Sequence, residues 1–329
     1  MEILQQEIKA DKRNLLELKV ASLYTRTEIV VPVIVEKAKE EGSTILIMGG
    51  IHGDEVNGIE IVRRLLFNKF TKPNCGTIIC IPIVNVMAFL NMNRKFADGR
   101  DLNRSFPGTL KGSLASQLAN SLTRKILPHA DYVIDLHTGA EQRFNYPQIR
   151  YDLNHEDNLN LAKAFNAPFT LLQNKVPNGS LRRVLNDSKT PVILFEGGKS
   201  RIITEEVVET GVQGVLNVLD YLNIRKLEKP LDSVEKTKFL HNNRWLRAKA
   251  SGMFQPVTKN GSFVKEGELL GYINGPYAQF HRKIKSPMDG YIFCVNRSSV
   301  VNLGEAIFHI GEERINEKPT NSFENPSVS

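Results

Sequence analysis

Four short apolar runs in the first two thirds of the chain constrain its fold most strongly. Each run is rich in β-branched and aliphatic residues, which suits strands that are buried on both faces of a sheet. Segments with apolar residues at helical spacing separate the runs. Strands that alternate with helices predict an α/β domain with a substantially parallel sheet. The runs are Thr44–Met48, Thr77–Val84, Tyr132–Leu136 and Pro191–Phe195, and the helical segments cover about residues 55–68, 114–126 and 204–222.

The pattern changes near residues 225–240, which are charged and resemble a linker. From about 244 to 311 the chain is glycine-rich and consists of short strand-like segments. Val264–Glu268 resembles Val301–Glu305, at an offset of 37 residues. Two similar units of this size predict a small pseudo-symmetric β-sandwich or barrel. We therefore expect an α/β domain over residues 1–232, a β-domain over 233–312 and a disordered polar tail over 313–329.

Polar residues follow three of the predicted strands at the point where each strand ends. His52 and Glu55 follow the first run, His137 follows the third, and Glu196 follows the fourth. In open α/β sheets, ligand sites form in the crevice beyond the carboxyl ends of the strands. We therefore expect these four side chains to converge.

The residue types of this group suit a metal. His52 and Glu55 are three residues apart, and His137 is the natural distant third ligand. Two histidines and a glutamate describe a catalytic zinc site that keeps one position open. Taken singly, His52 also fits a surface loop and His137 fits a hydrogen-bonded histidine at a strand end. Because such ligand sets bind several divalent metals, the sequence leaves another metal open. The expected cofactor is one Zn²⁺ per chain.

Glu196 follows five apolar residues and precedes two glycines. A charged side chain at the end of a buried strand is costly unless it is solvated, paired or associated with a metal. One interpretation is a general base that takes a proton from zinc-bound water. The alternative is a structural salt bridge.

Four motifs occur in a fixed order along the chain, and together they resemble a known family. They are Gly-Ile-His-Gly-Asp-Glu at 50–55, Asp-Leu-Asn-Arg-Ser-Phe-Pro-Gly at 101–108, Asp-Leu-His-Thr-Gly at 135–139 and Phe-Glu-Gly-Gly at 195–198. Over about residues 40–312 the chain resembles the succinylglutamate desuccinylase/aspartoacylase family, relatives of the zinc carboxypeptidases. It is most similar to the bacterial deacylases with a C-terminal β-domain like biotinyl and lipoyl modules. The resemblance implies a zinc-carboxypeptidase-like mixed, largely parallel sheet flanked by helices, plus a small all-β domain.

The resemblance also implies roles for individual residues. His52, Glu55 and His137 would hold zinc, and Glu196 would act as general base and then acid. Arg94 would stabilise the oxyanion. Asn103 and Arg104 would bind a substrate carboxylate. The family has a further substrate arginine before the catalytic glutamate; Arg182 and Arg183 are the two candidates for it, and the resemblance assigns the role to neither.

The implied activity is a zinc-dependent hydrolase that removes an N-acyl group from an amino acid or a similar small amine. Two alternatives stay open at this point. The first is a metallocarboxypeptidase that acts on peptides with the same zinc ligands. The second is a non-catalytic binding protein with the same fold.

Charge and cysteine content bear on partners and location. The net charge is +7, but no run of five or more basic residues occurs, so nucleic-acid binding is not expected. The expected partner is a small carboxylate-bearing N-acylated substrate, and the sequence does not exclude a homo-oligomer. Three cysteines without C-x-x-C spacing fit a reducing cytoplasm. No apolar stretch long enough for a membrane span or a secretory signal is present, so we expect a cytoplasmic protein.

Overall fold

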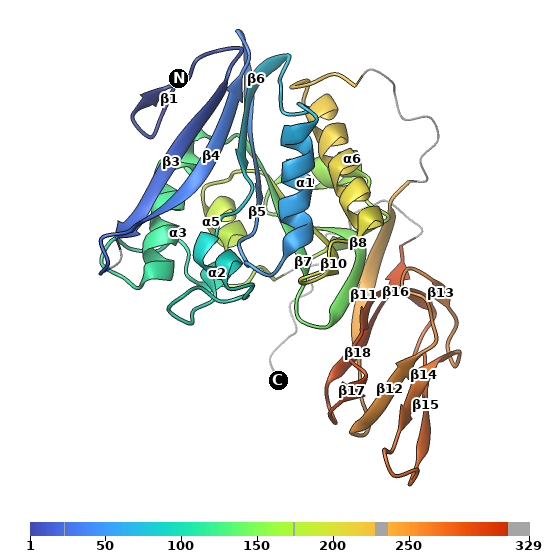
Figure 1. Cartoon of the computed structure of the whole chain (residues 1–329). Helices are drawn as coiled ribbons and strands as arrows, with labels where there is room; N and C mark the ends of the chain where they lie inside the picture. Colours follow the sequence, from blue (N-terminus) through green and yellow to red (C-terminus); the bar gives the residue numbers. More distant parts are fainter. Residues whose placement is uncertain (23, 174, 228–235, 315–329) are drawn as a thin grey trace, which may run out of the picture.

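The computed structural model describes residues 1–22, 24–173, 175–227 and 236–314. Its main element is one mixed sheet of twelve strands (Figure 1). From one edge to the other these are β3 (Arg13–Ser22), β4 (Glu28–Lys37), β6 (Cys75–Ile81), β5 (Glu40–Gly49), β7 (Tyr132–Gly139), β10 (Val192–Lys199), β8 (Arg143–Tyr151), β9 (Phe169–Leu172), β11 (Lys238–Arg247), β18 (Ala306–Glu313), β16 (Gly290–Asn296) and β13 (Phe263–Val264). A separate hairpin at the N-terminus pairs β1 (Glu2–Ile3) with β2 (Gln6–Glu7).

The middle of the sheet contains two groups of parallel strands. β6, β5, β7 and β10 are parallel to one another. β8, β9 and β11 form the second parallel group, and β8 is antiparallel to β10. The carboxyl ends of β5, β7 and β10 therefore meet at one edge of the sheet, where the predicted site residues follow them.

Both faces of the central strands are buried, which explains their continuous apolar sequence. In β5, Leu46 and Met48 pack into one hydrophobic core, while Ile45 and Ile47 pack into the core on the opposite face. The first core is covered by the helices α2 (Val86–Leu90), α3 (Leu114–Lys125) and α5 (Leu181–Asp187). The second is covered by α1 (Val56–Phe67), α4 (Glu156–Phe165) and α6 (Glu205–Tyr221). The helices predicted over 55–68, 114–126 and 204–222 are thus confirmed as α1, α3 and α6. The short turns η1 (Leu102–Arg104) and η2 (Leu127–His129) are 3₁₀ helices.

The C-terminal region is an all-β unit, drawn in orange and red in Figure 1. Its second sheet has the order β15 (His281–Lys285), β14 (Leu269–Asn274), β12 (Gly252–Pro256) and β17 (Val300–Val301). The strands β12, β13 and β14 recur as β16, β17 and β18 at an offset of 37 to 38 residues. The two halves exchange their short strands, since β17 pairs with β12 and β13 pairs with β16. The internal repeat in the sequence therefore corresponds to two similar three-strand units.

The main sheet continues from the α/β region into this β-unit. β11 pairs with β9 through Lys238–Leu240 and with β18 along the rest of its length. The predicted boundary at residues 232 and 233 lies outside the described residues, as does the predicted tail from 315 onward. Glu313, which we expected in that tail, is the last residue of β18. β16 also pairs with β8, so the β-unit lies directly against a strand that adjoins Glu196.

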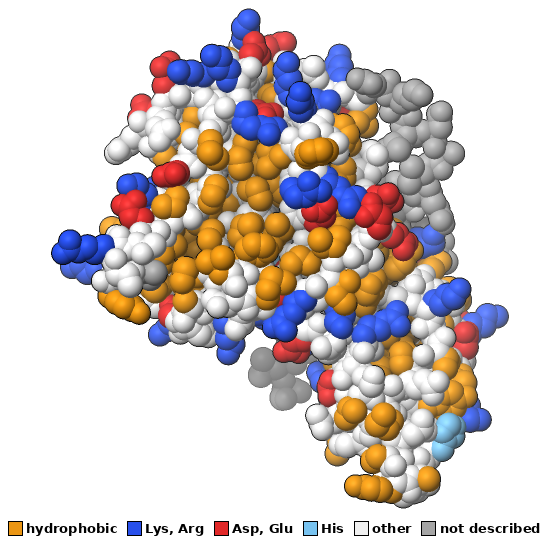
Figure 2. Space-filling model, in the orientation of Figure 1, with side chains coloured by type: hydrophobic (Ala, Val, Ile, Leu, Met, Phe, Trp, Pro, Cys, Tyr) orange, Lys and Arg blue, Asp and Glu red, His pale blue; other side chains and the backbone are white. Residues whose placement is uncertain are grey.

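None of the described helices is both long and apolar enough to cross a membrane. On the face shown in Figure 2, hydrophobic side chains gather over the middle of the α/β region. Lys and Arg side chains are distributed around them rather than gathered into a single patch on this face.

Candidate metal centre and active site

His52, Glu55 and His137 come together at the carboxyl ends of β5 and β7. The chain leaves β5 at Gly49 and reaches Glu55 just before α1 begins. Within this loop a Cβ on Gly53 would lie 2.0 Å from the carbonyl carbon of Ala88, so only glycine lets the loop pack this closely on α2. The convergence predicted for these three residues is confirmed by this arrangement, in which one ligand atom from each lies within 4.8 Å of the others.

Glu55 lies between the two imidazoles. Its Oε1 is 2.7 Å from Nδ1 of His52, and its Oε2 is 2.8 Å from Nδ1 of His137. The backbone N–H of Thr138 also donates to Oε2, at 3.0 Å. The three side chains are buried, with exposed fractions of 2%, 2% and 4% for His52, Glu55 and His137.

The outer nitrogen of each imidazole contacts a carboxylate. Nε2 of His52 is 2.9 Å from Oδ1 of Asp101, and Nε2 of His137 is 2.9 Å from Oδ2 of Asp135. Such carboxylates fix the orientation and tautomer of a ligating histidine and raise its basicity. Neither aspartate was assigned a role from the sequence. For Asp135 the available signal was its spacing of two residues from His137, which places both on one face of a strand.

The electrostatics of the cluster match the donors that zinc prefers. Burial favours a neutral Glu55, but the adjacent His52 and His137 hold the pKa of Glu55 well below its usual range. Burial likewise opposes protonation of His137, yet the charges of Asp135 and Glu55 raise the pKa of His137 to about 10. For His52, burial also opposes protonation, but the adjacent Glu55 and Asp101 raise its pKa. The space between these side chains favours positive charge. Two imidazole nitrogens and a carboxylate are ligands that suit a divalent cation such as Zn²⁺.

Arg94 lies directly beside this cluster. Its Nη1 donates to Oε1 of Glu55 at 2.9 Å, and its Nη2 donates to Oδ2 of Asp101 at 3.1 Å. About a third of its side chain is exposed, at 32%. The guanidinium is therefore held in a fixed position at the rim of the proposed metal site.

Glu196 lies on β10 in register with His137 of β7. Its Oε2 forms an ion pair with Nη2 of Arg150 on β8. Its side chain is 17% exposed, so it remains accessible. The sequence left a general base and a structural salt bridge open for Glu196. The ion pair with Arg150 is present, and Glu196 also lies in register with His137.

Asn103 and Arg104 lie in η1, which packs against the start of α5. The Oδ1 atom of Asn103 accepts a hydrogen bond from the backbone N–H of Leu181 at 2.9 Å. Arg104 is exposed and donates to the backbone oxygen of Asn103. Of the two arginines in α5, Arg183 pairs with Asp187 near the surface, whereas Arg182 is only 5% exposed. Arg182 donates to Oε1 of Gln173 and is the one that faces the interior.

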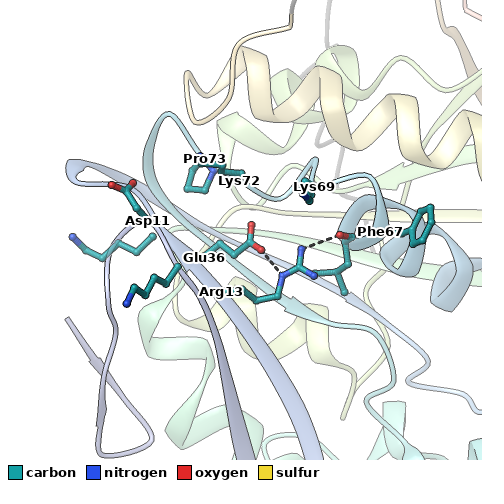
Figure 3. Close-up of a pocket in the computed structure, with 10 residues that line it drawn as sticks. Asp11, Arg13, Glu36, Phe67, Lys69, Lys72 and Pro73 are labelled. Atoms are coloured by element: carbon teal, nitrogen blue, oxygen red, sulfur yellow. Dashed lines mark hydrogen bonds and ion pairs between the residues drawn. The ribbon is translucent and has the colours of Figure 1, made fainter.

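A cavity of about 390 Å³ lies elsewhere, between β3, β4 and the end of α1 (Figure 3). At its centre Arg13 donates to Glu36 and to the backbone oxygen of Leu66. None of the predicted site residues lines this cavity. This cavity is therefore separate from the predicted site residues.

Comparisons with known proteins identify the family of the chain. The model of the succinylglutamate desuccinylase/aspartoacylase catalytic domain matches residues 41–222. The N-alpha-acetyl-L-2,4-diaminobutyric acid deacetylase of Halomonas elongata is 25% identical over 295 residues, which is 86% of each chain.

Two solved structures share the fold. A succinylglutamate desuccinylase from Silicibacter sp. TM1040 has a TM-score of 0.82 at 22% identity, covering 93% of this chain and 97% of the other. The product-bound ectoine utilization protein EutE (DoeB) from Ruegeria pomeroyi has a TM-score of 0.81 at 23% identity, with the same coverage. The fold expected from the motifs is thus the one that these proteins adopt.

Proposed function

The chain belongs to the succinylglutamate desuccinylase/aspartoacylase family, and from this premise we propose that it is a zinc-dependent hydrolase of N-acylated amino acids or similar small amines. One observation carries the proposal. The His52–Glu55–His137 cluster lies beside Glu196, which is in register with His137 on the neighbouring strand. This combination supports a cation site next to a carboxylate that is accessible to water.

The Nδ1 atoms of His52 and His137 and the carboxylate of Glu55 would hold the ion. A bound zinc ion supplies Lewis acidity, which polarises a carbonyl and lowers the pKa of water to about 7. Asp101 and Asp135 keep the two imidazoles oriented toward it.

Glu196 moves the proton. Its carboxylate takes a proton from the attacking water, whose oxygen forms a bond to the acyl carbon. When the C–N bond breaks, Glu196 returns the proton to the amine nitrogen, so the products are a free acid and an amine. The ion pair with Arg150 orients the Glu196 carboxylate during both transfers.

Arg94 donates hydrogen bonds to the acyl oxygen as negative charge develops on it. Because Glu55 and Asp101 already fix its guanidinium, little reorganisation accompanies the reaction. Asn103 and Arg104 bind a carboxylate of the substrate, and a guanidinium matches carboxylate geometry.

Metal content and hydrolysis together test this function. We expect about one zinc per chain by plasma mass spectrometry and cleavage of N-acyl amino acids in preference to dipeptides. The variant His52→Ala loses both the metal and the activity, whereas the exposed His281→Ala retains them. A wild-type protein that holds no zinc after reconstitution contradicts the proposal. Faster cleavage of dipeptides supports a metallocarboxypeptidase, and bound zinc without any hydrolysis supports a non-catalytic binding protein.

A further inference from the structure

The cavity of about 390 Å³ between β3, β4 and the end of α1 is rich in positive charge. Its lining contains five lysine and arginine side chains but only two carboxylates. Figure 3 shows Arg13 and Glu36 on the strands, and Lys69 and Lys72 on the turn that follows α1, around one hollow. A volume of this size lies within the range of small-molecule sites in proteins.

Both carboxylates of the lining already have a cationic partner. Glu36 is only 8% exposed, and Nε of Arg13 donates to its Oε1 at 2.5 Å. Asp11 pairs at 3.3 Å with Lys39, which lies outside the lining. These two acids are therefore committed to partners and leave the other positive charges of the cavity uncompensated.

Three lysines of the lining have no carboxylate partner. Lys37 pairs with Glu41 outside the cavity, whereas Lys12, Lys69 and Lys72 form no ion pair with any described residue. A lysine ammonium is a compact point charge that suits a phosphate group. Three such groups around one hollow attract a ligand that carries more than one negative charge.

The negative end of α1 does not cancel this attraction. Carbonyl groups at the end of a helix carry partial negative charge when they lack hydrogen bonds. Here the oxygen of Leu66 accepts from Nη2 of Arg13 at 2.8 Å and from the N–H of Lys69 at 3.3 Å. The oxygen of Leu65 accepts from the N–H of Phe70 at 2.8 Å. These bonds occupy the carbonyls and also fix the turn that carries Lys69.

Lys69 has a backbone conformation that favours glycine. Its φ is +58°, in the left-handed region, at the position just past a helix where glycine is the usual residue. A side chain at such a position strains the backbone. The chain nevertheless places a cationic side chain there, at the edge of the cavity.

The cavity also has an apolar wall. Leu66, Phe67 and Pro73 contribute to its lining, and the ring of Phe67 is 75% exposed. An exposed aromatic ring beside the lysines gains contact area when the organic part of a ligand covers it. The lining therefore suits an anionic group that is attached to a small apolar one.

We propose that this cavity binds a small phosphate ester. The phosphate lies among Lys12, Lys69 and Lys72, and the organic part lies against Leu66 and Phe67. None of the predicted metal, catalytic or substrate residues lines the cavity, so this site is independent of the proposed hydrolase activity.

Calorimetric titration of the zinc-loaded full chain tests the proposal, with phenyl phosphate and inorganic phosphate as the two probes. We expect the wild type to bind phenyl phosphate at least about threefold more tightly, because its ring covers the apolar wall. Lys12→Gln/Lys72→Gln should weaken the binding of phenyl phosphate about tenfold. Added sodium chloride should weaken binding to the wild type, since it screens exposed charges.

A matched pair of glycine variants separates binding from a structural role. Lys189 follows α5 as Lys69 follows α1, has a φ of +57°, and does not line the cavity. Lys69→Gly and Lys189→Gly each remove one charge and one strained conformation, so both should melt at the wild-type temperature or higher. Only Lys69→Gly should weaken the binding of phenyl phosphate, by about threefold. A purely structural role for Lys69 predicts a lower melting temperature and unchanged binding.

The remaining outcomes are decisive. Equal affinity in the wild type, Lys69→Gly and Lys12→Gln/Lys72→Gln overturns the proposal, because the phosphate then binds elsewhere, as it would at a bound zinc ion. Absence of binding to the wild type overturns it as well. Equal affinity of the wild type for the two probes, weakened in the lysine variants, assigns the cavity to inorganic phosphate and rejects the ester.

Discussion

The three predicted metal ligands on one side of Glu196 differ from the side chains on its other side in how their polar atoms are satisfied. Behind the ligands, Oδ1 of Asp135 has no partner among the described residues. Among the three predicted metal ligands, both nitrogens of each histidine and both oxygens of the glutamate contact a charged or polar partner. On the other side, both amide atoms of Gln148 and one nitrogen each of Arg150 and Arg182 have none within the described ranges.

This difference separates polar atoms that the fold pairs with one another from polar atoms that it buries without a partner. Carboxylates of Asp101 and Asp135 contact the two imidazoles without any metal present, so little reorganisation is expected at the predicted metal site. The unpartnered atoms around Gln148 cost stability in the folded protein. Mutation should therefore change the free energy of unfolding differently on the two sides.

The largest expected effect belongs to Glu196, which stands between the two regions. Glu196→Gln keeps the shape of the side chain but removes the group that moves the proton. We expect kcat to fall by about 10²- to 10⁴-fold while zinc content stays at the wild-type level. Steady-state kinetics and metal analysis on one preparation check both. The exposed Glu206→Gln on α6 serves as the control. Substantial turnover by Glu196→Gln would remove it from the mechanism.

A smaller effect is expected for the carboxylates that contact the two histidines. Asp135→Asn keeps the size of the side chain that contacts Nε2 of His137 but removes its charge. We expect zinc affinity to fall about 10- to 100-fold, measured by competition with a chelator. Asp101→Asn should act similarly through His52. If both variants bind zinc as tightly as the wild type, the carboxylates do not organise the site.

Local sequence motifs predicted the cluster of His52, Glu55 and His137 well and the residues on the other side of Glu196 poorly. The residues of the metal cluster follow apolar strands at short spacings, so a parallel sheet was enough to bring them together. Gln148 and Arg150 lie in β8, whose sequence, Arg-Phe-Asn-Tyr-Pro-Gln-Ile-Arg-Tyr, has no clear apolar run. Their place beside Glu196 depends on antiparallel pairing between β8 and β10, including the register, and that pairing is a non-local property.

Two buried amides sharpen the comparison through stability. Asn57 is 0% exposed like Gln148, but its Nδ2 donates to the backbone oxygen of Ile202 and its Oδ1 accepts from the N–H of Thr204, both at 2.8 Å. Asn57→Leu leaves these two backbone groups buried without a hydrogen-bond partner, so we expect the free energy of unfolding to fall by about 2 kcal/mol. Gln148→Leu should not lower it. Urea denaturation of the zinc-loaded proteins measures both, and equal destabilisation would show that Gln148 has a partner in solution.

His309 of β18 provides a second buried polar atom without a partner, away from Glu196. We expect it to affect the stability of the fold and not the activity. Its ring stacks on Trp245, with centroids 4.0 Å apart, and lies tilted against Phe293 at 4.2 Å. Its Nδ1 has no partner among the described residues. Burial, together with the charge of Arg150, lowers the pKa of His309 from 6.5 to about 3. The imidazole is then neutral in the folded protein, while the unfolded chain takes up a proton as the pH falls below 6.5.

The unfolded state therefore gains protons first, and the contribution of His309 to stability is lost from pH 6.5 downward until the folded form also titrates near pH 3. Between pH 7 and pH 5.5 this amounts to about 1 kcal/mol. His309→Phe retains an aromatic ring for the stack and removes the proton site. We expect its free energy of unfolding to fall by about 1 kcal/mol less than that of the wild type over the same interval, in urea titrations at the two pH values. Identical pH dependence in the two proteins would mean that His309 is solvated or protonated in the folded state, and that burial without a partner carries no cost at this position.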